Sequence, residues 1–130
     1  MRPDEVQALV NQTQARLDAE QSTYDTEKRG INHKIAEIKQ SIEFNRKEAE
    51  KIRTYGGDEK QASDFEQKAD TLERELETQA QDMKLALARK KQVIDEIKST
   101  LETHLAKLED AEDRQKVMNV ISALVRYGTE

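Results

Sequence analysis

Residues 54–60 read Thr-Tyr-Gly-Gly-Asp-Glu-Lys, and this stretch decides the fold because the sequence on both sides of it has a helical pattern. Gly56 can take the left-handed conformation that ends a helix, with Tyr55 as the last residue before it. Asp58 suits the N-cap of a following helix, since Gln61 stands three residues later, as in a capping box. The chain is therefore predicted to reverse direction at the Gly-Gly pair (turn 56–57), as in an αα-hairpin.

The first helix is predicted to span about residues 4–55. Its apolar residues recur every seven positions in two neighbouring stripes, which is the pattern of a coiled-coil seam. The stripes contain Val10, Leu17, Tyr24, Ile31, Ile38, Asn45 and Ile52, and then Ile35, Ile42 and Ala49. Gly30 interrupts this helix at a cost of about 1 kcal/mol relative to Ala. It is either a weak point or a place where another element approaches closely.

The second helix is predicted to span about residues 58–127 as one element, because no Gly or Pro interrupts it before Gly128. Its first seam positions are Phe65, Ala69, Leu72 and Leu76. The next seam position is predicted to be Ala80 rather than Gln79. Such an offset would be a stutter, which locally unwinds a supercoil.

Pairing and charge both favour a hairpin over a parallel coiled coil. When the chain folds back, seam residues whose numbers add up to one constant value face each other, for example Ile42 and Leu72. Residues 4–27 hold six acidic side chains and one Arg, whereas their partners in 84–107 hold six Lys or Arg and three acidic residues. A parallel dimer would instead place like charges together, which is unfavourable. The predicted fold is an all-α, long antiparallel coiled-coil helical hairpin, a single elongated domain over residues 1–130.

A mismatch in the second helix predicts an association surface. Leucines and isoleucines repeat every seven residues from 87 to 108, but their hairpin partners on the first helix are one Lys and three Gln. Residues 109–127 would also overhang the start of the first helix. We expect self-association or another protein to supply a helix that completes a bundle, although Gln and Lys stems could cover the stripe alone. The predicted surface comprises Leu87, Ile94, Leu101, Leu108, Val117, Met118, Val120, Ile121, Leu124 and Val125.

Composition and charge argue against several classes of protein. Charged residues make up 38% of the chain, aromatics 4%, and the net charge is −5. Lys and Arg are interspersed with Asp and Glu, so no basic face for nucleic acid stands out. No apolar run is long enough to span a membrane, and the first residues lack the apolar region of a signal peptide. We expect a cytoplasmic or nuclear protein with no nucleic-acid partner, no membrane insertion and, without Cys, no disulfide.

The predicted tip resembles that of a known family. Residues 57–65, Gly-Asp-Glu-Lys-Gln-Ala-Ser-Asp-Phe, are similar to the hairpin tip of bacterial transcript-cleavage factors of the Gre type. In that family the acidic tip reaches a metal in the active site of a polymerase. Asp58 matches the family's first acid, but Gln61 stands where the second acid belongs. The predicted tip comprises Tyr55, Gly56, Gly57, Asp58 and Glu59.

No catalytic residue, cofactor or metal site is predicted. The two histidines, His33 and His104, are far apart, no Gly-rich phosphate loop is present, and two helices offer no enclosed pocket. We expect a non-enzymatic structural or adaptor protein that mediates protein–protein contacts as a homodimer or within a larger assembly. Two alternatives are a regulator or chaperone-like hairpin that contacts a large machine through its tip, and a spacer fragment of a longer coiled-coil protein.

Overall fold

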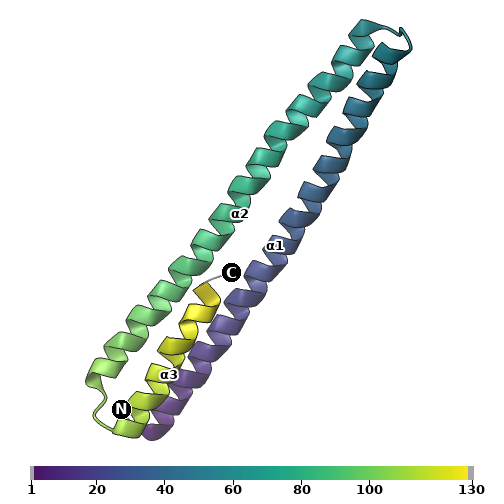
Figure 1. Cartoon of the computed structure of the whole chain (residues 1–130). Helices are drawn as coiled ribbons and strands as arrows, with labels where there is room; N and C mark the ends of the chain where they lie inside the picture. Colours follow the sequence, from purple (N-terminus) through teal and green to yellow (C-terminus); the bar gives the residue numbers. More distant parts are fainter. Residues whose placement is uncertain (1, 129–130) are drawn as a thin grey trace. The chain divides into compact units, whose positions relative to one another are not determined.

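The computed structural model describes residues 2–128 and contains three helices there (Figure 1). Helix α1 spans Pro3–Thr54, α2 spans Glu59–Lys107 and α3 spans Ala111–Gly128. The described residues contain no strand, so the predicted all-α class is confirmed. The prediction of only two helices is wrong. The contacts divide the chain into two compact units: unit 1 consists of residues 1–26 with 86–130, and unit 2 of residues 27–85.

Helix α1 has acidic residues at its start and basic residues at its end. Asp4 and Glu5 lie in the first turn, and Lys51 and Arg53 lie in the last turn. Both placements complement the helix dipole. Gly30 lies within α1, and a Cβ built on it would meet no atom within 4 Å. Gly30 is therefore a weak point in the helix and not a site of close approach.

The turn after α1 depends on its two glycines. Gly56 has a φ of 69°, and its N–H donates to the Arg53 carbonyl at 3.4 Å. The Gly57 N–H donates to the Ile52 carbonyl at 2.7 Å, so the two bonds together form a Schellman motif. A Cβ on Gly57 would lie 2.8 Å from Ile52 Cγ2. Side chains are thus disfavoured at both positions, at one by backbone conformation and at the other by packing.

Helix α2 begins directly after this turn. The Asp58 carboxylate Oδ1 accepts the Lys60 backbone N–H at 3.0 Å, and the Asp58 carbonyl accepts the Ala62 N–H at 3.1 Å. Asp58 is therefore the N-cap, because it satisfies one of the N–H groups that lack a partner within the helix.

Unit 2 is a pair of antiparallel helical segments from α1 and α2. Its buried cluster consists of Ile38, Ile42 and Ala69, against which Leu72 and Leu76 pack. Ion pairs join Arg46 to Glu73 and Arg53 to Glu66. A step of one heptad forward along α1 thus corresponds to one heptad backward along α2, as antiparallel packing requires.

The predicted stutter near Ala80 is wrong. Gln79 is buried in unit 2, whereas Ala80 is exposed. The buried and half-buried positions Leu72, Leu76, Gln79 and Met83 keep the regular alternation of four and three residues. The helix keeps its register because a Gln stem can lie in a narrow seam, and a small apolar residue gains too little by burial to shift the face.

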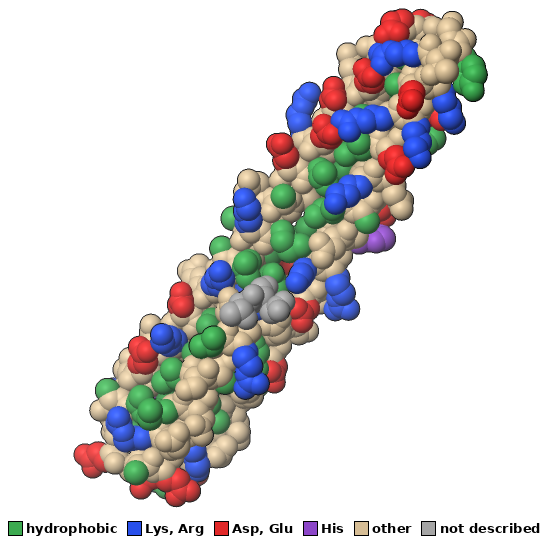
Figure 2. All heavy atoms as spheres, viewed as in Figure 1, with side chains coloured by type: hydrophobic (Ala, Val, Ile, Leu, Met, Phe, Trp, Pro, Cys, Tyr) green, Lys and Arg blue, Asp and Glu red, His purple; other side chains and the backbone are tan. Residues whose placement is uncertain are grey.

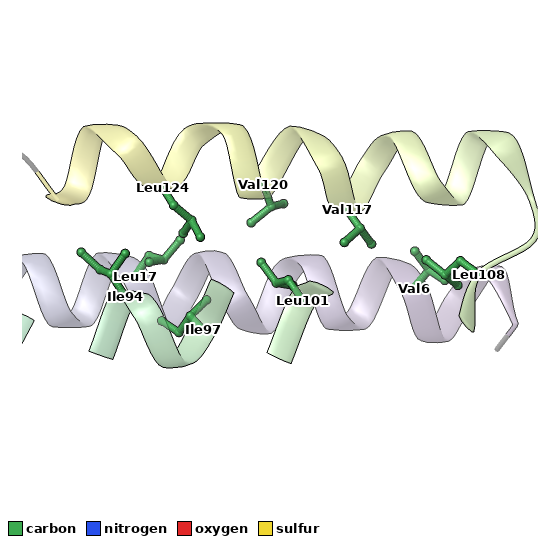
Figure 3. Packing of buried hydrophobic residues seen from close by; sticks show 9 residues of the cluster. All are labelled: Val6, Leu17, Ile94, Ile97, Leu101, Leu108, Val117, Val120 and Leu124. Carbon is green, nitrogen blue, oxygen red and sulfur yellow. The ribbon is translucent and has the colours of Figure 1, made fainter. Parts of the chain in front are cut away.

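Unit 1 is a three-helix arrangement in which α3 packs against the α1 and α2 segments. Its buried cluster consists of Val6, Leu17, Ile94, Ile97, Leu101, Leu108, Val117, Val120 and Leu124. Figure 3 shows side chains of α3 pointing toward the other two helices, with Leu124 directed toward Leu17 and Ile94. Three of these residues, Val117, Val120 and Leu124, follow the spacing of a single helix face.

The prediction that residues 109–127 continue the second helix and overhang the first is wrong, because α2 ends at Lys107. The Asp110 carboxylate caps α3 by accepting the Asp113 N–H at 3.0 Å. Arg114 Nη1 donates to the carbonyls of Leu105 at 2.8 Å and Leu108 at 3.0 Å, at the end of α2. Capping, carbonyl contacts and the burial of the apolar face of α3 together favour the turn over a continuous helix.

The seam of unit 1 also contains a charged side chain. Lys90 is almost fully buried, and its Nζ lies 4.6 Å from the centroid of the Tyr24 ring. Tyr24 belongs to the predicted stripe of α1 and is itself buried. The ring face offers the ammonium group a cation–π contact, which partly offsets the cost of removing the charge from water.

Candidate functional site

The candidate site is the seam of unit 2, which two helices cover only in part. Apart from Ile38 and Ile42, which are buried, the larger apolar side chains of this seam are half-buried: Ile31, Ile35, Ile52, Phe65, Leu72, Leu76 and Met83. Figure 2 shows apolar side chains reaching the surface between the two helices of this unit. A third helix would be needed to remove such side chains fully from water.

Ion pairs between α1 and α2 cover one edge of the unit 2 seam. Arg46 pairs with Glu73 across the two helices, and Arg53 pairs with Glu66 one heptad further on. A polar hollow on this edge is lined by Arg46, Glu50, Arg53, Thr54, Glu66 and Asp70. Long charged side chains from both helices thus lie over this edge, and their stems cover apolar surface beneath them.

The opposite edge carries a groove, here called the unit 2 groove. It is lined by Ser41, Asn45, Asp64, Gln67, Lys68, Thr71 and Leu72. Ser41 is short, so it leaves the space open that a longer side chain of α1 would fill. Leu72, a member of the seam, is consequently accessible from this edge.

Two large exposed apolar side chains lie on this side of unit 2, Phe44 beside the groove and Leu85 about 20 Å further along α2. Phe44 is 58% exposed and lines a second hollow together with Ser41 and Asn45, which also line the groove. Leu85 is 60% exposed and lies two heptads after Thr71, so it falls on the same stripe of α2. The groove has a polar rim with Leu72 of the seam accessible within it and Phe44 exposed beside it, and an apolar patch rimmed by polar residues is typical of protein interaction sites.

Asn45 lies in the seam at the groove. Its Nδ2 donates to the Ser41 carbonyl of the same helix at 2.7 Å, and its side chain is buried. In the register that pairs Ile42 with Leu72, the residue opposite Asn45 is Ala69, which is fully buried. The polar side chain is thus satisfied locally, which allows a polar residue to remain in the seam at limited cost.

The predicted tip residues lie together at the turn. Tyr55 is 84% exposed beside the two glycines. Asp58 accepts the Lys60 N–H as described above, and Glu59 accepts hydrogen bonds from Arg53 Nε at 3.2 Å and Nη2 at 2.9 Å. Both acidic groups of the predicted tip are therefore engaged in interactions within the chain.

Arg53 forms ion pairs with two carboxylates at this tip, those of Glu59 and Glu66. Hydrogen bonds to Glu59 and Glu66 raise the pKa of its guanidinium above the ordinary value. In turn, the hydrogen bond from Arg53 lowers the pKa of the Glu59 carboxyl below its ordinary 4.5. Arg53 therefore favours the ionised form of Glu59 and forms an ion pair with it across the turn.

The structure places most of the predicted association surface inside unit 1. Buried in its core are Ile94, Leu101, Leu108, Val117, Val120 and Leu124, while Ile121 packs against that core and Leu87 is half-buried. Only Met118 and Val125 are exposed. The apolar stripe of α2 that had only Lys and Gln as predicted partners thus packs against α3 of the same chain. A helix from a second copy or from another protein was expected in that place.

The predicted stripes of α1 leave out the face that α3 covers. Val6 and Thr13 are buried in unit 1, and Leu9 packs against its core. These residues lie beside the predicted stripes and widen the apolar face of α1 before residue 26. A face wider than a two-helix seam, together with Asp110 as a possible cap, could have indicated the third helix.

Comparison with known protein families, curated proteins and solved structures found no match to this chain. Within residues 2–128, no group of three or more His, Asp or Glu side chains is placed to hold a metal ion. Over the same described residues, none of the helices has the length and apolar character needed to cross a membrane.

Proposed function

We propose that this chain is a non-enzymatic coiled-coil adaptor whose unit 2 groove binds an amphipathic helix of a partner protein. The observation that carries this proposal is the half-open seam of unit 2, with Phe44 exposed beside the groove and Leu85 exposed further along the same side of α2. A helix laid in a groove between two helices is a common mode of recognition.

Unit 1 indicates the kind of helix that fits such a groove. There, α3 packs on an equivalent pair of helical segments through Val117, Val120 and Leu124, which are spaced three and four residues apart. A partner helix with apolar residues at the same spacing would cover Leu72 and contact Phe44. Asp64 and Lys68, which line the groove, would meet polar residues of either sign at its margins.

The test introduces a photoreactive benzoylphenylalanine in place of Phe44 or Leu85 of the full chain, in the cells that produce it. Glu50 on the ion-paired edge is the matched control position. We expect one protein to crosslink from both positions 44 and 85, because a partner helix that runs along this side of unit 2 reaches both, and not from the control. The purified partner should then bind Phe44→Ser at least roughly tenfold more weakly, which is the effect of losing one buried aromatic side chain.

Two results would contradict the proposal. One is an equal yield of the adduct from the control position. The other is unchanged affinity of the purified partner for a chain that carries both Phe44→Ser and Leu85→Ser, provided that circular dichroism shows the same helix content as in the unaltered chain.

A contact through the tip is the second candidate, and the exposure of Tyr55 favours it. Under that alternative, Tyr55→Ser would abolish partner binding, and the Phe44→Ser and Leu85→Ser changes would leave it intact. The same purified partner and the same binding assay therefore separate the two candidates.

A further inference from the structure

The turn between α2 and α3 lacks the residues that normally force a helix to end. It consists of Leu108, Glu109 and Asp110, without Gly or Pro. None of the described residues other than Gly56 has a positive φ, so no residue of this turn requires a left-handed conformation. Leu and Glu are good helix formers, and the local sequence is therefore compatible with one continuous helix.

The turn is held by a small number of side-chain contacts. Asp110 caps the Asp113 N–H, and Arg114 contacts the carbonyls of Leu105 and Leu108. In a straightened helix, the N–H groups of residues 109–113 would instead donate to the carbonyls four residues before them. Straightening thus exchanges side-chain hydrogen bonds for backbone hydrogen bonds and leaves few groups without a partner.

The contacts that hold α3 in place do not depend on which copy of the chain supplies it. Val117, Val120 and Leu124 insert between the α1 and α2 segments of unit 1 (Figure 3). At the other end of α3, Gln14 Nε2 donates to the Tyr127 hydroxyl at 2.8 Å, and that hydroxyl donates to Asp18 Oδ1 at 3.1 Å. An α3 from a second copy can make every one of these contacts.

We infer that unit 1 also accepts the α3 of a second copy of this chain, with α2 and α3 of each copy joined into one helix through residues 108–110. The product is a dimer with reciprocally exchanged α3 helices. Because the packing is the same in both forms, the balance between them depends on the turn and on protein concentration. This inference concerns unit 1 and does not depend on the function proposed for unit 2.

A pair of substitutions in the turn tests the inference. Asp110→Ala removes the cap of α3 and leaves a good helix former. A typical N-cap shifts the equilibrium between the closed turn and the continuous helix roughly fivefold, so removing it from the two turns of a dimer should raise the dimer association constant about 25-fold. Ala111→Pro is the matched control, since Pro is favoured at the first position of a helix but prevents a continuous one. Ala111 is exposed, so the ring has room.

Light scattering after size-exclusion chromatography reports the mass, and crosslinking reports the exchange. The chain contains no Cys, so only introduced thiols react. Both variants are therefore made in a chain that also carries Gln14→Cys and Tyr127→Cys. In the Asp110→Ala dimer, a short bismaleimide should link position 14 of one chain to position 127 of the other. In the Ala111→Pro monomer, it should link positions 14 and 127 of the same chain. Asp110→Glu, which keeps the charge and removes the cap, should behave as Asp110→Ala does.

Three results would overturn the inference. The first is that both Asp110 variants remain monomeric at millimolar concentration with full helix content. The second is a dimer whose bismaleimide links stay within single chains, since that dimer forms by simple contact of closed monomers. The third is that Ala111→Pro dimerises as readily as Asp110→Ala.

Discussion

The packing of α3 predicts opposite outcomes for two adjacent residues. Leu124 is 4% exposed and belongs to the core of unit 1, whereas its neighbour Val125 is 69% exposed. Leu124→Ala removes three buried carbon atoms, worth about 2.4 kcal/mol at about 0.8 kcal/mol for each. The cavity that remains adds to this, so the expected loss is about 2–5 kcal/mol in the free energy of unfolding. Val125→Ala should change it by less than about 0.5 kcal/mol.

The assay is urea unfolding followed by far-ultraviolet circular dichroism, with both variants and the unaltered chain at one concentration. A helix of 18 residues is marginal by itself, so weakened packing should also lower the helix signal before the main transition. Equal effects of the two substitutions would refute the assignment of Leu124 to the packed face of α3. A loss below about 0.5 kcal/mol for Leu124→Ala would refute its burial.

Two further predictions concern unit 2. Gly56→Ala should lower the free energy of unfolding by about 1–2 kcal/mol, because position 56 has a φ of 69°. The matched change Gly30→Ala, in open space within α1, should raise it by about 0.5–1 kcal/mol. A higher urea midpoint for Gly56→Ala would contradict the first assignment, and a lower one for Gly30→Ala would contradict the second. Because Arg53 lowers the pKa of Glu59, their pairing stabilises the fold above the unfolded carboxyl pKa and is lost as pH falls through the folded one. A carboxyl titration by nuclear magnetic resonance should give Glu59 a midpoint below 4.5, and a midpoint at or above that value would exclude the pairing in solution.

Much of the fold follows from local sequence signals. Helix α1 was expected over about residues 4–55 and spans Pro3–Thr54, because its apolar residues keep one phase for its whole length. The start of α2 was expected at about residue 58 and lies at Glu59, next to the Asp58 cap. Glycines and caps act within a few residues, so they can be read without knowledge of the tertiary structure.

The third helix could not be read in the same way. The α2–α3 turn contains neither Gly nor Pro, and its decisive contacts join residues that local patterns do not connect, such as Arg114 with the Leu105 carbonyl. The competing choice, one helix to residue 127, satisfies the same local preferences. What decides between them is the burial of the apolar face of α3 on α1, a gain that depends on packing between distant segments.

The candidate site was also only partly predictable. The sequence identified the seam and placed Asn45 in it, but it did not indicate which edge of unit 2 is open. That difference arises because Arg46 and Glu73 meet across one edge, whereas the short Ser41 leaves the other edge uncovered. Phe44 and Leu85 stood outside the predicted stripes; Phe44 gains its importance from its place beside the groove, and Leu85 from its exposure further along the same side of α2.

The most direct test of the central claim, that α3 covers the α1 and α2 segments of unit 1, is a nuclear Overhauser experiment on a methyl-labelled chain. Figure 3 shows Leu124 directed toward Leu17, so we expect a cross-peak between their methyl groups, together with cross-peaks from Val117 to other methyls of the unit 1 core. Methyl groups of α3 that show cross-peaks only among themselves, at the chemical shifts of an unfolded segment, would contradict it.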